Sequence, residues 1–137
     1  MILIGIESVK LWIGLITVGI VENLKRGTVE LLLLTLLNEQ DMYGYQLSQE
    51  LDRRSEGLFT LQEGSMYPTL YRLQSKNLIS DRQEQVGKRR MRVYYHIEPE
   101  GVAYLKEIRQ EYISLNRGIL KVLGIGYLEG DEHGEHL

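Results

Sequence analysis

The sequence predicts a mainly α-helical fold that also contains a small β-hairpin. Three segments with helical periodicity come first, and two strand-like runs on either side of a glycine follow them. A final segment repeats apolar residues at heptad spacing, which is typical of a helix that pairs with another helix. This order of elements predicts a winged helix-turn-helix with a long C-terminal dimerisation helix.

The length and composition indicate a single working unit. A chain of 137 residues can form one domain and an assembly arm, but not two independent globular domains. Its 43% hydrophobic and 26% charged residues are ordinary for a globular protein. The absence of cysteine excludes disulfides and thiolate metal sites and fits a reducing cytoplasm, so we expect a cytoplasmic protein. We also expect no cofactor.

The charges are unevenly distributed along the chain, although the net charge is only -3. Residues 53–92 carry 9 basic and 4 acidic side chains, a net charge of +5. Residues 1–52, with 3 basic and 7 acidic side chains, and residues 93–137, with 4 and 8, each have a net charge of -4. A basic centre within an acidic frame is expected when one small surface meets phosphates.

The first 22 residues are predicted to be an apolar N-terminal extension. The stretch without charges, residues 11–21, is about half as long as a membrane-spanning helix and follows Glu7 and Lys10, so we expect no membrane anchor. A signal peptide is also a poor fit, because a basic start and a cleavage site are missing. Two alternatives remain: an apolar element that packs on the dimer, or an extension created by the choice of start codon, with Val21 as a natural beginning.

Residues 23–98 are predicted to form the winged helix-turn-helix domain. The segment 28–37 is apolar on nearly all sides, as in a helix buried in a core. Apolar residues recur at every fourth position from 43 to 51, which predicts a second, amphipathic helix. Thr60 and Glu63 have capping-box spacing at the start of a third helix. The apolar face of that third helix carries Met66, Leu70 and Leu73.

A hairpin, a long helix and a tail complete the predicted chain. The strands cover residues 78–86 and 91–97, and Gly87 makes the turn between them. Residues 99–125 form the dimerisation helix, and residues 126–137 form a flexible acidic tail in which we expect no metal site. The heptad seam of the long helix needs a partner and consists of Leu105, Ile108, Tyr112, Leu115, Ile119 and Val122.

The outer face of the third predicted helix is small, polar and basic, and it carries no acid. A carboxylate there would be repelled by the DNA backbone, so its absence fits close approach to phosphates and base edges. At 100° per residue, the face and its flanks hold Gly64, Ser65, Tyr67, Pro68, Thr69, Tyr71, Arg72, Ser75 and Lys76.

The hairpin tip holds the strongest cluster of positive charge in the chain. Lys88, Arg89, Arg90 and Arg92 lie within five residues, beside Gly87. Taken alone, such a run is usually a solvated tip that keeps a hairpin soluble. Together with an acid-free third helix and the order of the elements, it favours a wing that holds DNA phosphates.

Four segments together resemble the PadR family of transcriptional regulators, over about residues 23–123. A Gly-Ser-x-Tyr-Pro sequence in the third helix and a Tyr-Tyr strand after a basic hairpin are specific in combination. The segments are residues 23–30 (NLKRGTVE), 43–47 (YGYQL), 63–73 (EGSMYPTLYRL) and 89–97 (RRMRVYYHI), the last of them just before Pro99, Glu100 and Gly101.

The resemblance implies a homodimeric regulator of operator DNA, usually a repressor. Its final helix would form the dimer, and an effector, where there is one, would bind near the dimer interface. By position, the residues that face the groove would be Ser65, Tyr67, Pro68, Tyr71, Arg72 and Lys76, and those that hold phosphates would be Lys88, Arg89, Arg90 and Arg92.

Catalysis is the class of function with the least support in this sequence. We find no nucleophile beside a base, no carboxylate pair and no glycine-rich phosphate loop. The alternative to DNA binding is a winged-helix module that binds another protein, which the acidic net charge favours and the cationic wing disfavours. Measuring binding at increasing salt concentrations distinguishes the two hypotheses. Binding through phosphates weakens steeply as the salt concentration rises, whereas protein binding through an apolar surface should barely respond.

Overall fold

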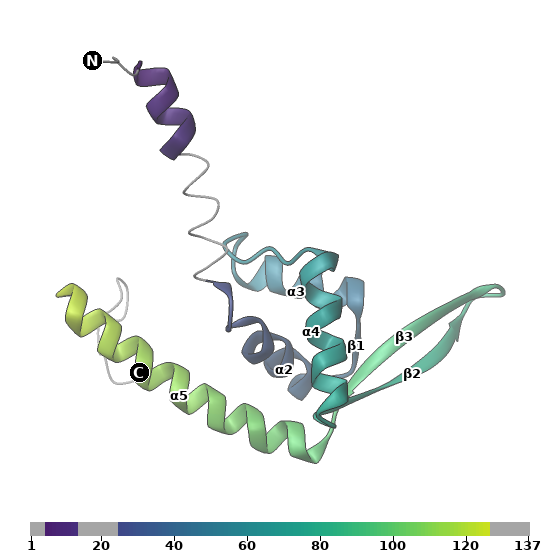
Figure 1. Ribbon diagram of the computed structural model, residues 1–137. Coiled ribbons are helices and arrows are strands. Elements are labelled where there is room, and N and C mark those ends of the chain that lie inside the picture. Colours follow the sequence, from purple (N-terminus) through teal and green to yellow (C-terminus); the bar gives the residue numbers. More distant parts are fainter. Residues whose placement is uncertain (1–4, 14–24, 127–137) are drawn as a thin grey trace.

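The computed structural model describes residues 5–13 and 25–126. Three helices form a compact group, from which a β-hairpin projects on one side and a long helix on the other (Figure 1). The predicted acidic tail lies almost wholly outside the described residues, as does much of the predicted N-terminal extension. In chain order the elements are α2 (Val29–Glu39), β1 (Met42–Tyr43), α3 (Gly44–Arg54), α4 (Glu63–Ser75), β2 (Ile79–Val86), β3 (Arg90–Ile97) and α5 (Pro99–Leu123), and residues 6–13 are also helical.

Helix α2 lies at the centre of the core, which explains why it is apolar on nearly all sides. It packs against α3, α4, α5 and β3, so that Leu33 and Leu34 are fully buried. Leu47 of α3 and Leu70 of α4 complete this core and are also fully buried. Burial of one such leucine contributes about 1.5–3 kcal/mol to folding. The three predicted helices are therefore confirmed, with small shifts at their ends.

The sheet has three strands rather than the predicted two. The order is β1-β3-β2, and both pairs are antiparallel. In β1, Met42 pairs with Tyr95 and Tyr43 with Tyr94. The prediction that Tyr43 starts the second helix is wrong, because α3 begins at Gly44. A strand of two residues is too short to show the alternation by which strands are recognised.

The predicted capping box at the start of α4 is also wrong. The residue that precedes the helix is Gln62, and its side chain makes no capping hydrogen bond. Thr60 instead donates a hydrogen bond from its hydroxyl to the Asp52 carboxylate of α3, at 3.1 Å. The intervening Leu61 is buried in the core, and this burial decides where the loop ends.

A polar cluster holds the base of the hairpin against the end of α2. Nδ1 of His96 in β3 lies 2.7 Å from the Asp41 carboxylate, and Arg82 in β2 pairs with the other oxygen of that carboxylate. Partial burial opposes ionisation of Asp41, but the contacts with His96 and Arg82 outweigh it and lower the pKa of this carboxyl. The cluster ties the wing to the helical domain.

Helix α5 packs on the domain only through its first turns. Pro99 occupies its first turn, and Gly101 and Leu105 are the buried residues. The 25-residue helix, about 38 Å long at 1.5 Å per residue, then leaves the domain and ends at Leu123, and the following Gly124 caps it with a φ of 78°. Within the described ranges, no helix combines the length and the hydropathy needed to cross a bilayer.

Candidate nucleic-acid interface

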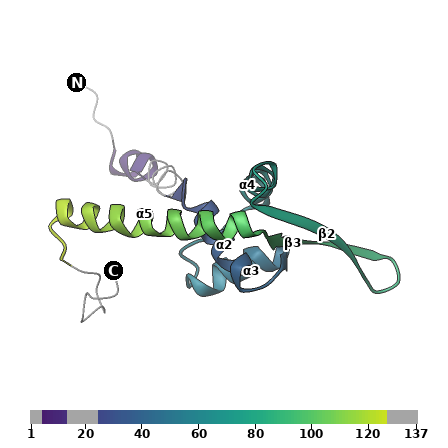
Figure 2. The ribbon, with the colours of Figure 1, turned by 90° about the horizontal axis from the view of Figure 1, so that it is seen from below.

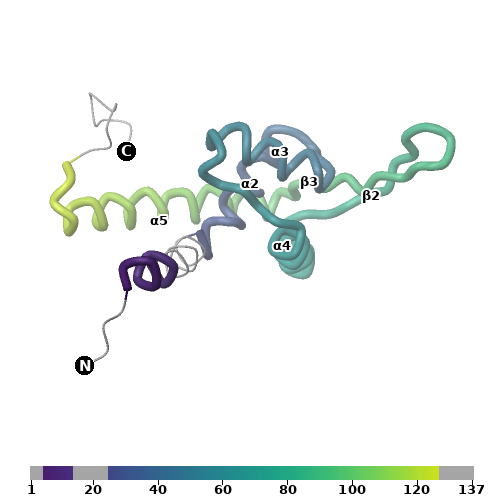
Figure 3. Tube along the Cα trace, turned by 90° about the horizontal axis from the view of Figure 1, so that it is seen from above, coloured from purple at the N-terminus to yellow at the C-terminus, as the bar shows by residue number. Residues whose placement is uncertain are grey.

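Helix α4 presents an uncovered face on one side of the molecule. Viewed from below and from above, α4 and α3 lie on opposite sides of the line formed by α5 and the hairpin (Figures 2 and 3). The helix anchors itself with Met66, Thr69, Leu70 and Leu73, which are buried. Its opposite face is therefore turned outward, where a nucleic acid can reach it.

The structure brings most of the predicted groove-facing residues to this outer surface. Tyr67 is the exception, because it is half-buried at the edge of the helix. Thr69, which was predicted at the flank of this face, is buried, and its hydroxyl donates a hydrogen bond to the Ser65 carbonyl at 3.0 Å. The exposed residues of the predicted set are Ser65, Pro68, Tyr71, Arg72 and Lys76.

The four predicted phosphate-binding cations do not act as one cluster. Lys88, Arg89 and Arg90 are exposed at the tip of the hairpin. No acidic side chain in residues 5–13 and 25–126 forms an ion pair with these three. Their charge is therefore available to an external anion, as a wing that contacts a phosphate backbone requires.

Arg92 lies apart from the tip, at the side of the hairpin that faces α3. Its guanidinium group lies over the Tyr43 ring, 4.3 Å from the ring centre. The Tyr43 ring in turn meets Tyr94 edge to face, with the centroids 5.5 Å apart. A cation held on an aromatic face loses less side-chain freedom when it binds a ligand. Arg92 is thus pre-positioned beside α4.

A tyrosine-rich hollow of about 310 Å³ lies between α4, the start of α3 and β3. Tyr67 and Tyr71 form its α4 wall, with ring centroids 6.2 Å apart. Gly44 lets Tyr67 approach α3, because a Cβ at Gly44 would lie 2.4 Å from the Tyr67 hydroxyl oxygen. The residues that line the hollow are Tyr43, Gly44, Tyr45, Tyr67, Tyr71, Arg92, Val93 and Tyr95.

Two hydroxyls of this hollow stay protonated at neutral pH. Burial raises the pKa of Tyr95 to about 12, and burial also raises the pKa of Tyr67. Tyr95 is only 3% exposed and belongs to the core, so its hydroxyl is not placed to contact DNA. The exposed Tyr45 hydroxyl accepts a hydrogen bond from the Gln49 amide at 2.8 Å, which leaves its own proton free to donate.

On the other flank of α4, the carboxylate of Glu30 from α2 joins three elements. Arg72 donates a hydrogen bond through Nε at 3.2 Å, and the Lys76 ammonium group lies 3.8 Å away. Tyr104 of α5 donates to the second carboxylate oxygen at 3.1 Å. The predicted groove residues Arg72 and Lys76 are thus paired within the protein, while half of each side chain remains exposed.

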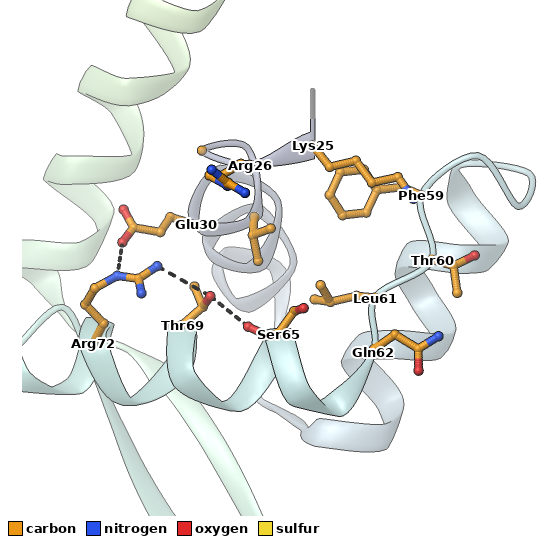
Figure 4. Close-up of a pocket in the computed structure, with 12 residues that line it drawn as sticks. Lys25, Arg26, Glu30, Phe59, Thr60, Leu61, Gln62, Ser65, Thr69 and Arg72 are labelled. Atoms are coloured by element: carbon orange, nitrogen blue, oxygen red, sulfur yellow. Dashed lines mark hydrogen bonds and ion pairs between the residues drawn. The ribbon is translucent and has the colours of Figure 1, made fainter. Parts of the chain in front are cut away.

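A larger hollow, of about 620 Å³, lies beside this junction (Figure 4). Lys25 and Phe59 lie together at one end of it, with the Lys25 ammonium group 5.3 Å from the centre of the Phe59 ring (Figure 4). Glu30, Thr69 and Arg72 lie at the other end of it, where Arg72 turns toward Glu30 (Figure 4). The hollow therefore follows the Ser65–Arg72 flank of α4.

The predicted seam of α5 is divided between the core and the surface. Leu105 is buried within its own domain, and Ile108 packs against the same core. The remaining four residues of the seam, Tyr112, Leu115, Ile119 and Val122, are exposed.

Three residues of this surface, Glu30, Tyr45 and Tyr104, were not predicted from the sequence as functional residues. Glu30 is the only charged residue in the otherwise apolar segment 28–37, which was a usable signal. Tyr104 carries no such signal, because it meets Glu30 of α2 only through the fold. Tyr45 lies four residues before its partner Gln49 on α3, a spacing that is common and marks no site by itself. No group of three metal-ligating side chains occurs in the part of the chain that the structure describes, and the histidines of the tail lie outside it.

Comparison with known proteins gives the family. The sequence profile of the "Transcriptional regulator PadR-like family" matches residues 33–107. The chain belongs to this PadR-like family. The resemblance predicted from the four segments is thereby confirmed, and membership of a family of transcriptional regulators agrees with the prediction that the protein is not an enzyme.

Individual relatives agree with the family assignment. The transcriptional regulator Rv3488 of Mycobacterium tuberculosis is 34% identical over 96 residues, which are 70% of this PadR-like chain and 86% of that protein. The crystal structure of a PadR family regulator from Eggerthella lenta superposes with a TM-score of 0.73 at 29% identity and covers 82% of this chain and 96% of its own. These similarities confirm the winged helix-turn-helix with a long C-terminal helix.

Bacillus subtilis PadR, solved in complex with operator DNA, shares the fold at 19% identity. The TM-score is 0.55, and the match covers 58% of this chain and 46% of that chain. This likeness shows the fold alone, whereas the family profile and the Mycobacterium tuberculosis relative identify the protein as a PadR-family transcriptional regulator with a DNA-binding winged helix-turn-helix.

Proposed function

We propose that the protein is a homodimeric repressor that binds a specific operator in double-stranded DNA and is released by an effector. Helix α4 reads the major groove in this proposal, and the hairpin contacts the flanking backbone. The protein acts in the cytoplasm, without a cofactor.

The observation that carries this proposal is that an acid-free, exposed face on α4 occurs together with exposed cations at the tip of the hairpin. The outer face of α4 carries Tyr71 and Arg72 and no acid, and the hairpin tip carries three cations that form no ion pair within the described residues. Groove reading requires donors and acceptors on an exposed helix, and backbone contact requires cations. Operator DNA in the Bacillus subtilis relative supports the same kind of ligand here.

The exposed part of α5 supports the dimer. Tyr112, Leu115, Ile119 and Val122 continue the heptad spacing beyond the domain, and Val122 is 89% exposed. Water-exposed apolar residues at this spacing are stabilised when a second helix covers them. A second copy of this chain is the partner that we propose, and the apolar helix at residues 6–13 is a further candidate for this interface.

Two symmetric copies suit a palindromic operator. A dimer places two α4 helices in two half-sites, which lie about one helical turn of DNA apart in related motifs. An effector that binds near the α5 interface would change the distance between the two helices and thereby release the DNA. In this proposal the same dimer represses transcription while it is bound to the operator, and it leaves the operator when the effector binds.

Fluorescence anisotropy with the protein's own upstream promoter and with a random duplex of equal length tests the proposal. We expect tighter binding to the promoter at every salt concentration, and a linear fall of log affinity with log salt for both duplexes. Absence of binding to either duplex at low salt would refute the proposal. It would favour the protein-interaction module instead, whose binding through an apolar surface depends little on salt.

A further inference from the structure

We propose that Glu30 determines sequence specificity, by withholding the charges of Arg72 and Lys76 from DNA of any sequence. This inference rests on the proposed function, because it assumes that α4 enters the groove. Glu30 is a positioning residue in this proposal and acts through Arg72. It does not touch the DNA itself.

The geometry shows one covered carboxylate shared by two half-exposed cations. The Glu30 side chain is 17% exposed, whereas those of Arg72 and Lys76 are 52% and 49% exposed. Tyr104 holds the second carboxylate oxygen from α5. Arg72 is further supported by a contact of Nη2 with the Thr69 hydroxyl at 3.4 Å. Side chains from the α4 region and from α5 therefore hold the carboxylate that Glu30 extends from α2.

Non-specific DNA gains little from cations that are held in this way. A phosphate that contacts Arg72 while the ion pair is intact also meets the negative charge of Glu30, and a phosphate that draws Arg72 away leaves a largely covered carboxylate without one of its charged partners. Non-specific affinity depends almost entirely on phosphates neutralised by free cations. We therefore expect random DNA to be held mainly by the hairpin tip.

A matching base edge can be met without breaking this ion pair. Arg72 contacts Glu30 through Nε, and Nη1 makes no hydrogen bond within the described residues. The outer edge of the guanidinium group can thus donate to acceptors such as O6 and N7 of guanine. The carboxylate fixes the direction of that edge, so Glu30 weakens wrong complexes and orients the contact in the right one.

The substitution Glu30→Gln tests this inference, in the same anisotropy assay with promoter and random duplexes. Glu39→Gln is the matched control, because it removes the same charge from an exposed ion pair with Arg54. For Glu30→Gln we expect random-duplex affinity to rise about threefold to tenfold, the log-log salt slope to steepen by about one, and promoter preference to fall. Glu39→Gln should leave promoter preference unchanged.

A double-mutant cycle shows whether Glu30 acts through the two cations. In an Arg72→Ala/Lys76→Ala background, Glu30→Gln should no longer change random-duplex affinity. If Glu30→Gln does not fold, Arg72→Lys serves instead, because one ammonium group cannot hold Glu30 and also present a planar fork to a base. Arg72→Lys should lose promoter preference and keep its random-duplex affinity.

Three results would overturn the inference. They are equal effects of Glu30→Gln and Glu39→Gln, persistence of the Glu30→Gln effect without Arg72 and Lys76, and retention of promoter preference by Arg72→Lys. Each of them leaves the proposed function intact as long as the wild type prefers its promoter. Failure of the wild type to bind either duplex refutes the proposed function instead, so the two failures are distinguishable.

Discussion

Gly101 packs so closely against Leu78 that a Cβ atom at Gly101 would lie 2.1 Å from the Leu78 carbonyl oxygen. The same oxygen accepts a hydrogen bond from the backbone N–H of Glu98, at 2.9 Å. Leu78 precedes the hairpin and Gly101 lies in the first turn of α5. This contact therefore joins the wing to the proposed dimerisation helix.

Gly101→Ala should destabilise the protein, because neither the backbone of Leu78 nor that of α5 can move without loss of the Glu98 hydrogen bond. We expect the free energy of unfolding to fall by about 1–3 kcal/mol. Gly118→Ala on the same helix is the control: a Cβ there meets nothing within 4 Å, and alanine favours a helix by about 1 kcal/mol. Urea unfolding of both variants checks the prediction, and equal changes would contradict it.

Arg72→Ala should reduce promoter binding more than Lys88→Ala does. Arg72 lies on the outer face of α4, where side chains read bases, whereas Lys88 at the hairpin tip neutralises phosphate. We expect Arg72→Ala to cost about 1–3 kcal/mol on the promoter, and Lys88→Ala to weaken both duplexes alike and lower the salt slope by about one. Equal losses on both duplexes for both variants would contradict these roles.

Leu115→Glu should dissociate the proposed dimer. Leu115 is 65% exposed in the single chain, at a position where the heptad seam would meet a second copy. Gln110→Glu adds the same charge to an exposed position on the opposite side of α5 and should leave the dimer intact. Light scattering after size-exclusion chromatography measures both masses. A wild-type monomer, or a Leu115→Glu dimer, would show that this seam is not the interface.

Asp41 should make the hairpin base more stable above about pH 4 than below it. Its pKa is lowered in the folded chain, so its stabilising effect is fully present above the ordinary carboxyl pKa of about 4 and disappears as pH falls through the lowered value. Asp41→Asn should be less stable than the wild type near neutral pH, and this difference should shrink in acid. Urea unfolding across a pH series measures it, and a constant difference would exclude this role of Asp41.

Much of the fold was predictable because local patterns here agree with tertiary packing. The all-round apolar segment 28–37 is the central helix α2, and the turn predicted at Gly87 has a positive φ of 76°. The two-residue strand β1 and the start of α4 were missed, because neither follows from periodicity. The first depends on pairing with β3, and the second on burial of Leu61.

The sequence by itself determined the order of the elements, the basic centre between acidic ends, and the acid-free face of the third helix. Each of these depends on residue type and spacing along the chain, which are local properties. Only the tertiary structure decided that Arg72 and Lys76 share the carboxylate of Glu30, that Tyr104 contacts the same group, and that Arg92 lies on Tyr43. Those contacts join residues of different elements, and distance along the chain does not determine distance in space.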